Sequence, residues 1–298
     1  MVMHRKKCNK REEHRMNIGL RLHDTISGTL EERLRFIKGQ GFSCAHTALS
    51  KVLDDFRMED APSKLTKEFA SELQESFGKA GIDCVILGCY LNLANPDPEE
   101  REKTGEIYRA HLRFAPMMGA SMVGTETPAN PNSRFAKDPW EDEDAFRFLV
   151  DCLRPAVRWA EEAGTILAVE PVYRHILSTP ERAERLLTEI PSDSLRIILD
   201  AVNLLAPDAI FRADEIIGEA IRRLGDRVVL LHMKDYLPGE EELNAVACGR
   251  GRMRYEQLIS LAMERHLPMT LENTTPDNAE AARLHLEAIG EKLRQAKA

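Results

Sequence analysis

The chain has 298 residues, 43% of them hydrophobic and 30% charged, which is enough apolar material for a large folded core. Its formal net charge of −8 argues against a nucleic-acid-binding protein, whose surface has to neutralise phosphates. No apolar run approaches the ~20 residues that a membrane-spanning helix requires, so neither nucleic acid nor a membrane is an expected partner.

The first fifteen residues, Met1–Arg15, are polar and basic, with six Lys or Arg against two Glu. They lack the apolar core of a secretory signal and any periodicity, so we expect a disordered arm. The stretch that begins at Met16 opens an apolar strand directly, which suggests that Met16 is the true start. A mitochondrial targeting arm is the alternative, and the acidic Glu12 and Glu13 disfavour it.

From Met16 onward, short apolar runs alternate with stretches that carry apolar residues at helical spacing. The runs predict strands at 18–22, 42–47, 83–89, 121–124, 165–170, 195–200, 227–232 and 268–272. The intervening stretches predict helices at 29–39 (after a cap at Ser27), 65–80, 99–118, 144–163, from the cap at Thr179, at 213–224, 255–265 and from the cap at Thr275 to about 294. Eight such alternations without a composition shift predict a single-domain (β/α)8 TIM barrel over residues 16–298. Residues 129–142 form a long loop of the kind that serves as a lid or binding loop.

Six scattered cysteines form no CxxC pair. Cys44, Cys84 and Cys89 lie in or near expected strands, where a free cysteine packs as a small apolar residue. This pattern predicts free thiols, a reducing compartment and a cytoplasmic location.

Four of the expected strands end in a residue that can bind a metal, namely Glu170, Asp200, His232 and Glu272. They are 30, 32 and 40 residues apart, about one βα repeat each, so parallel strands would place them at one rim. Each residue alone would more often be a helix cap, a surface charge or a hydrogen-bonded core histidine. Three carboxylates at one barrel mouth, however, cannot all stay ionised without a cation. Oxygen and imidazole ligands suit Mg²⁺, Mn²⁺, Co²⁺ or Zn²⁺.

The motifs around these residues resemble the xylose isomerase-like TIM barrel superfamily of sugar isomerases and epimerases. The resemblance extends from Met16 to the end, and its motifs are Glu170-Pro171, Leu199-Asp200-Ala-Val-Asn203, His232-Met-Lys-Asp235, Gly249-Arg-Gly-Arg-Met253 and Leu271-Glu272-Asn273. It implies one divalent metal ion held by Glu170, Asp200, His232 and Glu272. Relatives often form homodimers or homotetramers, so either assembly is expected.

The chemistry of such a site fits a sugar or sugar-phosphate isomerase or epimerase. A metal ion acting as a Lewis acid on a ketose or aldose makes the neighbouring C–H acidic, because it stabilises the enediolate. We predict Glu170 and Glu272 as the catalytic pair that removes and returns the proton. Asp200 and His232 would mainly hold the metal, with His232 neutral. Return of the proton to the opposite face gives an epimer, and return to the neighbouring carbon gives an isomer.

Five residues near the strand ends are predicted substrate contacts, namely Glu126, Asn203, Lys234, Asp235 and Arg252. Asn203 stands where many relatives carry a substrate-binding His, which departs from the pattern of free-sugar epimerases. The alternative for Glu126 is a structural role that supports its loop. The alternative for Lys234 and Asp235 is a surface ion pair at the end of the strand. Arg250 or Arg252 could hold a phosphate or carboxylate, or could belong to a solvated turn.

His23 and His46, near the ends of the first two strands, are interpreted as wall residues rather than ligands. Other functions stay open on this pattern. A lyase such as a keto-inositol dehydratase shares the metal chemistry but expels a hydroxyl. An apurinic endonuclease of the superfamily needs three metals, more histidines and a basic groove, which the acidic composition disfavours. A non-catalytic barrel would be indicated by a missing ligand, and none is missing.

Overall fold

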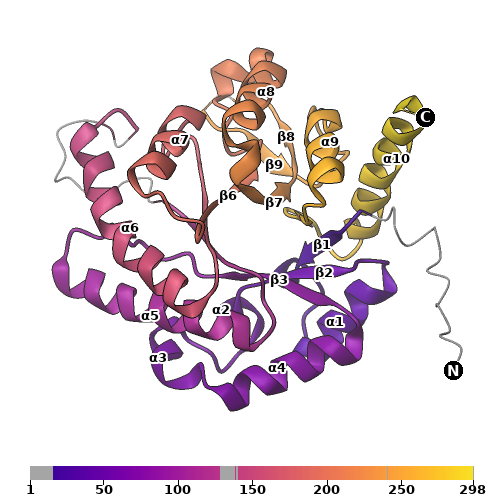
Figure 1. Ribbon diagram of the computed structural model, residues 1–298. Coiled ribbons are helices and arrows are strands. Elements are labelled where there is room, and N and C mark those ends of the chain that lie inside the picture. The colour runs from indigo at the N-terminus through magenta and orange to yellow at the C-terminus, as the bar shows by residue number, and fades with distance from the viewer. Residues whose placement is uncertain (1–15, 128–137, 139, 240, 298) are drawn as a thin grey trace, which may run out of the picture.

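The computed structural model describes residues 16–127, 138, 140–239 and 241–297 (Figure 1). The expected arm at 1–15 and most of the expected loop at 129–142 therefore lie outside the described residues. Among the described residues, no helix has the length and apolarity needed to cross a membrane. The described cysteines are free thiols, as the sequence predicted.

Eight parallel strands close into a barrel in the order β1-β10-β7-β6-β5-β4-β3-β2, which confirms the predicted (β/α)8 fold. They are β1 (Ile18–Arg21), β2 (Cys44–Thr47), β3 (Asp83–Gly88), β4 (Val123–Glu126), β5 (Leu167–Glu170), β6 (Leu195–Asp200), β7 (Val228–Met233) and β10 (Met269–Leu271). Side chains fill the barrel interior and helices cover its outside, so the strands are buried on both faces. This burial is why the strands are nearly continuous apolar runs.

In the described part of the chain, eight helices of ten or more residues surround the barrel, as predicted (Figure 1). They are α1 (Leu30–Gly39), α4 (Lys67–Ala80), α5 (Pro98–Met117), α6 (Glu143–Ala163), α7 (Pro180–Glu189), α8 (Ala213–Leu224), α9 (Glu256–Arg265) and α10 (Ala279–Lys297). The predicted cap of α1 at Ser27 was wrong. Thr29 caps the helix, because its side chain accepts from the backbone N–H of Glu32 and the Glu32 side chain accepts from the backbone N–H of Thr29.

The sequence analysis missed several short elements. These are α2 (Leu49–Val52), α3 (Ala61–Lys64), the 3-10 turns η1 (Leu22–Asp24), η2 (Met58–Asp60), η3 (Pro207–Arg212) and η4 (Gly225–Arg227), and an antiparallel hairpin of β8 (Asp235–Leu237) and β9 (Asn244–Val246). Elements of three to six residues are too short to show a reliable hydrophobic period. The hairpin matters here because it follows β7 directly at the barrel mouth.

The strand order divides the barrel mouth into two halves. Strands β10, β7, β6 and β5 are consecutive neighbours and come from the C-terminal half of the chain, whereas β4, β3, β2 and β1 come from the N-terminal half. The C-terminal half runs from rose through orange to yellow, and the N-terminal half runs from indigo to magenta (Figure 1). The register pairs Asp200 with His232 and Glu126 with Glu170, so these side chains start from adjacent positions on one rim.

Candidate metal centre and catalytic site

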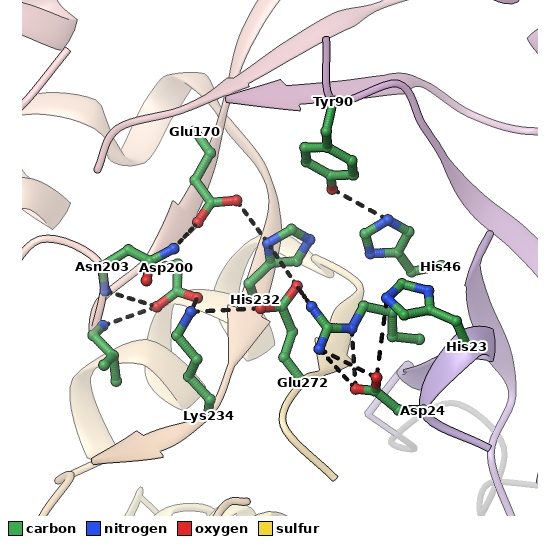
Figure 2. A network of polar contacts seen from close by, with 12 residues as sticks. His23, Asp24, His46, Tyr90, Glu170, Asp200, Asn203, His232, Lys234 and Glu272 are labelled. Atoms are coloured by element: carbon green, nitrogen blue, oxygen red, sulfur yellow. Dashed lines mark hydrogen bonds and ion pairs between the residues drawn. The ribbon is translucent and has the colours of Figure 1, made fainter. Parts of the chain in front are cut away.

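The structure brings the four predicted metal-binding residues together at the carboxyl ends of adjacent strands (Figure 2). Glu170 ends β5, Asp200 ends β6, His232 lies in β7 and Glu272 follows β10. All four are buried, with at most 6% of any residue exposed. Nδ1 of His232 lies 2.9 Å from Oε2 of Glu170 and 3.4 Å from Oε1 of Glu272. The carboxyl ends of parallel strands are where reactive groups gather in such barrels.

Two side-chain cations already lie among these carboxylates. The sequence analysis named Lys234 only as a substrate contact or surface residue, and it did not name Arg21. Nζ of Lys234 lies 2.8 Å from Oδ2 of Asp200 and 3.5 Å from Oε2 of Glu272. An Nη atom of Arg21, at the end of β1, lies 3.3 Å from Oε1 of Glu272, and the same guanidinium forms a two-point contact with Asp24. Lys234 and Arg21 therefore supply part of the positive charge that these carboxylates need.

The charge count still leaves room for a divalent ion. Glu170, Asp200 and Glu272 carry three negative charges when ionised, and Lys234 neutralises one of them. The charge of Arg21 is neutralised by Asp24, because its guanidinium donates to both carboxylate oxygens of that residue. With His232 neutral, as a metal ligand has to be, the cluster thus retains two net negative charges in a buried position, where uncompensated charge is strongly disfavoured.

The same contacts shift the pKa values of His232 and Glu272 in opposite directions. Burial lowers the pKa of His232, but the carboxylates of Glu272 and Glu170 outweigh burial and raise that pKa to about 9. Burial also opposes ionisation of Glu272, yet His232, Lys234 and Arg21 together hold the pKa of Glu272 well below its usual range. In the absence of another cation, the imidazole therefore carries a proton and Glu272 stays ionised.

Two other carboxyl groups are harder to ionise. Burial raises the pKa of Asp200 to about 6, although Lys234 opposes the shift. Burial and the neighbouring charges of Glu170 and Glu272 raise the pKa of Glu126 to about 7. A group with such a pKa exchanges its proton near neutral pH, which is a property of acid–base residues in active sites.

The donor set fits a divalent ion of the kind predicted. Glu170, Asp200 and His232 each offer a ligand atom, and these atoms lie within 4.8 Å of one another. His46, His232 and Glu272 form a second such group, so His232 belongs to both. Nε2 of His232 is buried and has no hydrogen-bond partner among the described residues. Carboxylate oxygens with one imidazole are suitable donors for Mn²⁺, Mg²⁺, Co²⁺ or Zn²⁺.

A tight turn after β6 explains the position of Asn203. Oδ1 of Asp200 accepts from the backbone N–H groups of Val202 and Asn203, at 2.9 and 3.1 Å. The turn directs Nδ2 of Asn203 to Oε1 of Glu170, to which it donates at 2.5 Å. The spacing Asp-x-x-Asn therefore links the ends of β6 and β5.

The other predicted substrate contacts occupy different positions. Glu126 ends β4 beside Glu170. Lys234 and Asp235 are both buried, so the alternative of a surface pair was wrong. Asp235 instead accepts from the backbone N–H groups of Tyr236, Gly249, Gly251 and Met253 at 2.7–3.0 Å, and so fixes the glycine-rich loop to the rim. Arg252 lines a separate groove of about 300 Å³, together with the exposed Phe211 and the buried Tyr236.

Three residues of the opposite half of the mouth complete the site (Figure 2). The Tyr90 hydroxyl lies 3.1 Å from Nε2 of His46, and the His46 ring stacks on His232 with centroids 5.3 Å apart. His23 contacts His46 edge to face. Burial lowers the pKa of His46 well below its ordinary value, and burial with the charge of Arg21 lowers the pKa of His23 to about 3. The interpretation of the two histidines as wall residues stays a prediction, because His46 also belongs to a group that could hold a metal ion. Tyr90 and Arg21 were missed.

A family model described as "Xylose isomerase-like TIM barrel" matches residues 12–291. The chain belongs to this family. A search among curated proteins found no match.

Solved structures share the fold at low sequence identity. One is titled D-tagatose 3-epimerase-like protein, with a TM-score of 0.72, 16% identity, and coverage of 95% of this chain and 100% of that chain. A second is the 3-keto-D-glucoside 4-epimerase YcjR from E. coli, with a TM-score of 0.69, 16% identity, and coverage of 94% and 100%. A third is the IOLI protein with a bound zinc atom, with a TM-score of 0.69, 16% identity, and coverage of 94% and 96%. At this identity the likeness establishes the fold alone.

Proposed function

We propose that this xylose isomerase-like barrel is a divalent-metal-dependent isomerase or epimerase of a sugar or sugar phosphate. The observation that carries the proposal is the buried cluster of Glu170, Asp200, His232 and Glu272, which retains two net negative charges beside Lys234 when His232 is neutral. The proposal is also supported by the epimerase and zinc-bound structures that share the fold.

Glu170, Asp200, His232 and Glu272 would hold the ion, with His232 neutral. When bound, a divalent ion supplies Lewis acidity, which makes a C–H beside a sugar carbonyl easier to ionise. Asp200 would contribute an oxygen fixed by the turn after β6, and its other oxygen faces Lys234. Which of the four metals is bound stays a prediction.

Glu170 and Glu272 would exchange the substrate proton. They come from β5 and from the end of β10, two strands separated in the barrel by β6 and β7. A carboxylate on each side of a substrate carbon can remove a proton from one face and return one to the other. Glu170 contacts His232 and the neutral amide of Asn203, whereas both oxygens of Glu272 face side-chain cations. These cations hold the pKa of Glu272 below its usual range, so Glu272 stays ionised.

The predicted substrate contacts differ in how directly they would act. Glu126, Asn203 and Lys234 border the cluster and keep the role of substrate contacts in this proposal. Asp235 would act by holding the loop of Gly249–Met253, and Arg252 would contact a substrate only through a part that extends into the groove beside Phe211. A homodimer or homotetramer and a cytoplasmic location stay predictions.

Metal analysis combined with deuterium incorporation from D₂O tests the proposal. Wild type and Glu272→Gln are compared on D-tagatose, L-ribulose and D-fructose, with and without a chelator. We expect metal-dependent exchange of one substrate C–H in wild type and a loss of roughly 10²–10⁴-fold in the variant. Glu75→Gln, an exposed glutamate of α4, is the matched control and should behave as wild type.

Each contrary result has a defined meaning. Exchange that persists after complete metal removal would contradict the metal-dependent proposal. Product formed without solvent exchange would indicate hydride transfer. Loss of a hydroxyl from the product would identify a lyase in place of an isomerase. No exchange on any sugar of the panel would contradict the assignment to sugars of this type.

A further inference from the structure

A hydrogen-bonded pair of neutral side chains faces the metal-binding cluster from the N-terminal half of the mouth. His46 lies in β2, Tyr90 follows β3, and the Tyr90 hydroxyl is 3.1 Å from Nε2 of His46. In the closed barrel, β2 stands opposite β6 and β3 stands opposite β7. The pair is therefore aimed across the mouth at the half that carries Asp200 and His232 (Figure 2).

The chain makes specific room for this pair. Gly88 ends β3, and a Cβ atom at this position would lie 2.9 Å from Nε2 of His46 and 2.7 Å from a ring carbon of Tyr90. Both distances are shorter than real Cβ atoms tolerate, so any side chain at residue 88 would push the two rings apart. Close packing of this kind fixes the orientation of a binding group before a ligand arrives.

One polar atom of the pair is left without a protein partner. Nδ1 of His46 is buried and has no hydrogen-bond partner among the described residues, and the residue is 1% exposed. A buried polar atom that makes no hydrogen bond is costly, so such atoms in binding sites are commonly used by a ligand. The His46 ring stacks on the ring of His232, a predicted metal ligand, with the two ring centroids 5.3 Å apart.

Hydrogen-bond chemistry determines what the pair can bind. If Tyr90 donates to Nε2, then Nδ1 of His46 carries the proton and donates, and the phenol oxygen accepts. If Nε2 donates to Tyr90, then Nδ1 accepts and the phenol donates. In both tautomers the pair offers one donor and one acceptor, which matches a hydroxyl group, since a hydroxyl both donates and accepts.

Among the described residues, an arginine beside this pair is already engaged by carboxylates. The guanidinium of half-buried Arg21 contacts both oxygens of Asp24 and one oxygen of Glu272. Phosphate recognition generally uses arginine or lysine side chains whose charge is available to the ligand. The chemistry of the pair itself thus favours hydroxyl groups over a phosphoryl group.

We propose that His46 and Tyr90 bind the hydroxyl-bearing part of the substrate as one donor–acceptor unit, and so determine specificity for an unphosphorylated polyol segment at this wall. The inference rests on the proposed function, because it assigns the substrate end that lies away from Asp200 and Lys234. It goes beyond that function because it needs no contribution of the pair to metal binding or proton removal.

Binding of ribitol, which has hydroxyls but no carbonyl, separates recognition from chemistry. Its affinity is measured by calorimetry on the Mn²⁺-loaded protein for wild type, Tyr90→Phe, His46→Gln and the double variant, and D-tagatose turnover is measured in parallel. Each single variant should bind ribitol about 3- to 10-fold more weakly, as expected for one lost hydrogen bond. Because the two side chains act together, the double variant should lose little more ribitol affinity than the single variant with the larger loss. Metal content should not change.

A histidine outside the mouth serves as the matched control. His111→Gln, a buried histidine of α5, should leave ribitol affinity unchanged. Thermal melting of every variant shows whether folding is retained, and Tyr90→Phe removes only one oxygen atom.

The outcomes distinguish this inference from the proposed function. If wild type exchanges sugar protons but Tyr90→Phe and His46→Gln bind ribitol as wild type does, the pair is not a binding wall. If the variants lose ribitol affinity while wild type exchanges no sugar proton, the wall stands and the isomerase proposal fails. Independent, multiplicative losses in the double variant would contradict a single donor–acceptor unit, as would loss of metal in either single variant.

Discussion

The two halves of the barrel mouth carry side chains of different chemistry. The C-terminal half, from β5, β6, β7 and β10, gathers Glu170, Asp200, His232 and Glu272 with Lys234 into a buried network of charges. The N-terminal half faces it with His46 and Tyr90, which are joined by a hydrogen bond between uncharged groups. One half is suited to hold an ion, and the other is suited to hold hydroxyl groups.

The contrast between the halves shows how a symmetric fold supports an asymmetric site. The eight strands offer equivalent positions at the rim, yet the four predicted metal ligands lie at the ends of four consecutive strands. Ligands for one ion have to reach a common point, so neighbouring strands are the natural source. A substrate that extends from that point then meets the strands on the opposite side. Predictions that change one half and monitor the other test this division.

Removal of the internal cation should have the largest effect. Lys234→Met leaves Asp200 and Glu272 without their shared ammonium group, and we expect the free energy of unfolding of the chelated protein to fall by about 3–5 kcal/mol. Added Mn²⁺ should restore much of this loss, since it supplies positive charge to the same carboxylates. Urea unfolding with and without Mn²⁺ measures both effects. Arg212→Met, which breaks an exposed pair with Glu215, is the control and should change little. Equal stability of Lys234→Met and wild type after chelation would show that Lys234 is not the required counter-charge.

Metal binding should depend on pH through His232. Its pKa is raised to about 9, so it is protonated at pH 7 in the chelated protein, and a ligand imidazole has to lose that proton. We expect release of about one proton from His232 per ion at pH 7.5, and an affinity that rises about tenfold per pH unit up to about pH 9. Calorimetry in buffers of different ionisation enthalpy counts the protons. His46→Gln should release the same number, because His46 is already neutral.

The raised pKa of His232 also makes the stability of the chelator-treated protein depend on pH. Because the folded state holds the His232 proton more tightly than the unfolded chain does, this contribution is complete below the ordinary pKa of histidine, near 6.5. It is lost as the pH rises through about 9, so the chelated protein should be less stable at pH 9 than at pH 7. A rise in stability of the chelated protein over this range would contradict the assigned pKa.

A change at Asp235 should have a smaller effect on stability. It tests whether Asp235 holds the glycine-rich loop in place or contacts the substrate. Asp235→Asn removes the charge that accepts from four backbone N–H groups, and we expect the free energy of unfolding to fall by about 1.5–3 kcal/mol. Hydrogen exchange should accelerate at Gly249, Gly251 and Met253, with metal affinity retained. Asp193→Asn, at an exposed aspartate, is the control. Weakened sugar binding without faster exchange would support direct substrate contact instead.

The smallest expected effect comes from filling the space at Gly88. Gly88→Ala should push the rings of Tyr90 and His46 apart, lower the free energy of unfolding by about 1 kcal/mol and weaken ribitol binding a few-fold. Metal affinity should stay unchanged, because no carboxylate is touched. Gly78→Ala, in α4, adds a methyl group into open space and is the matched control. If Gly88→Ala lowered metal affinity as strongly as ribitol affinity, the two halves would not be independent.

Much of the fold could be predicted because it follows from local patterns. Apolar runs of four to six residues alternate with helical periods, and each long helix has a recognisable stretch of its own, such as Pro98–Met117 or Glu143–Ala163. Boundaries were less certain, because caps depend on single side-chain geometries. Thr29, rather than Ser27, is in place to exchange hydrogen bonds with Glu32. The β8–β9 hairpin has three residues in each strand, too few to produce a period.

The positions of Glu170, Asp200, His232 and Glu272 were predictable for a related reason. A parallel barrel places all its strand ends at one rim, so a residue at a strand end is placed once the strands are known. The sequence could not show which cations would stand among the carboxylates. Lys234 was open to a surface role, and Arg21 follows an apolar strand 251 residues before Glu272.

The sequence by itself therefore determined the barrel, its repeat and the chemical types of residue at the strand ends, because these depend on periodicity along the chain. Only the tertiary structure decided that Lys234 bridges Asp200 and Glu272, and that Tyr90 pairs with His46. The reason is physical: ion pairs and hydrogen bonds depend on distances of about 3 Å between atoms on different strands. Those distances are set by closure of the barrel and by the packing of its side chains, and no single segment contains them.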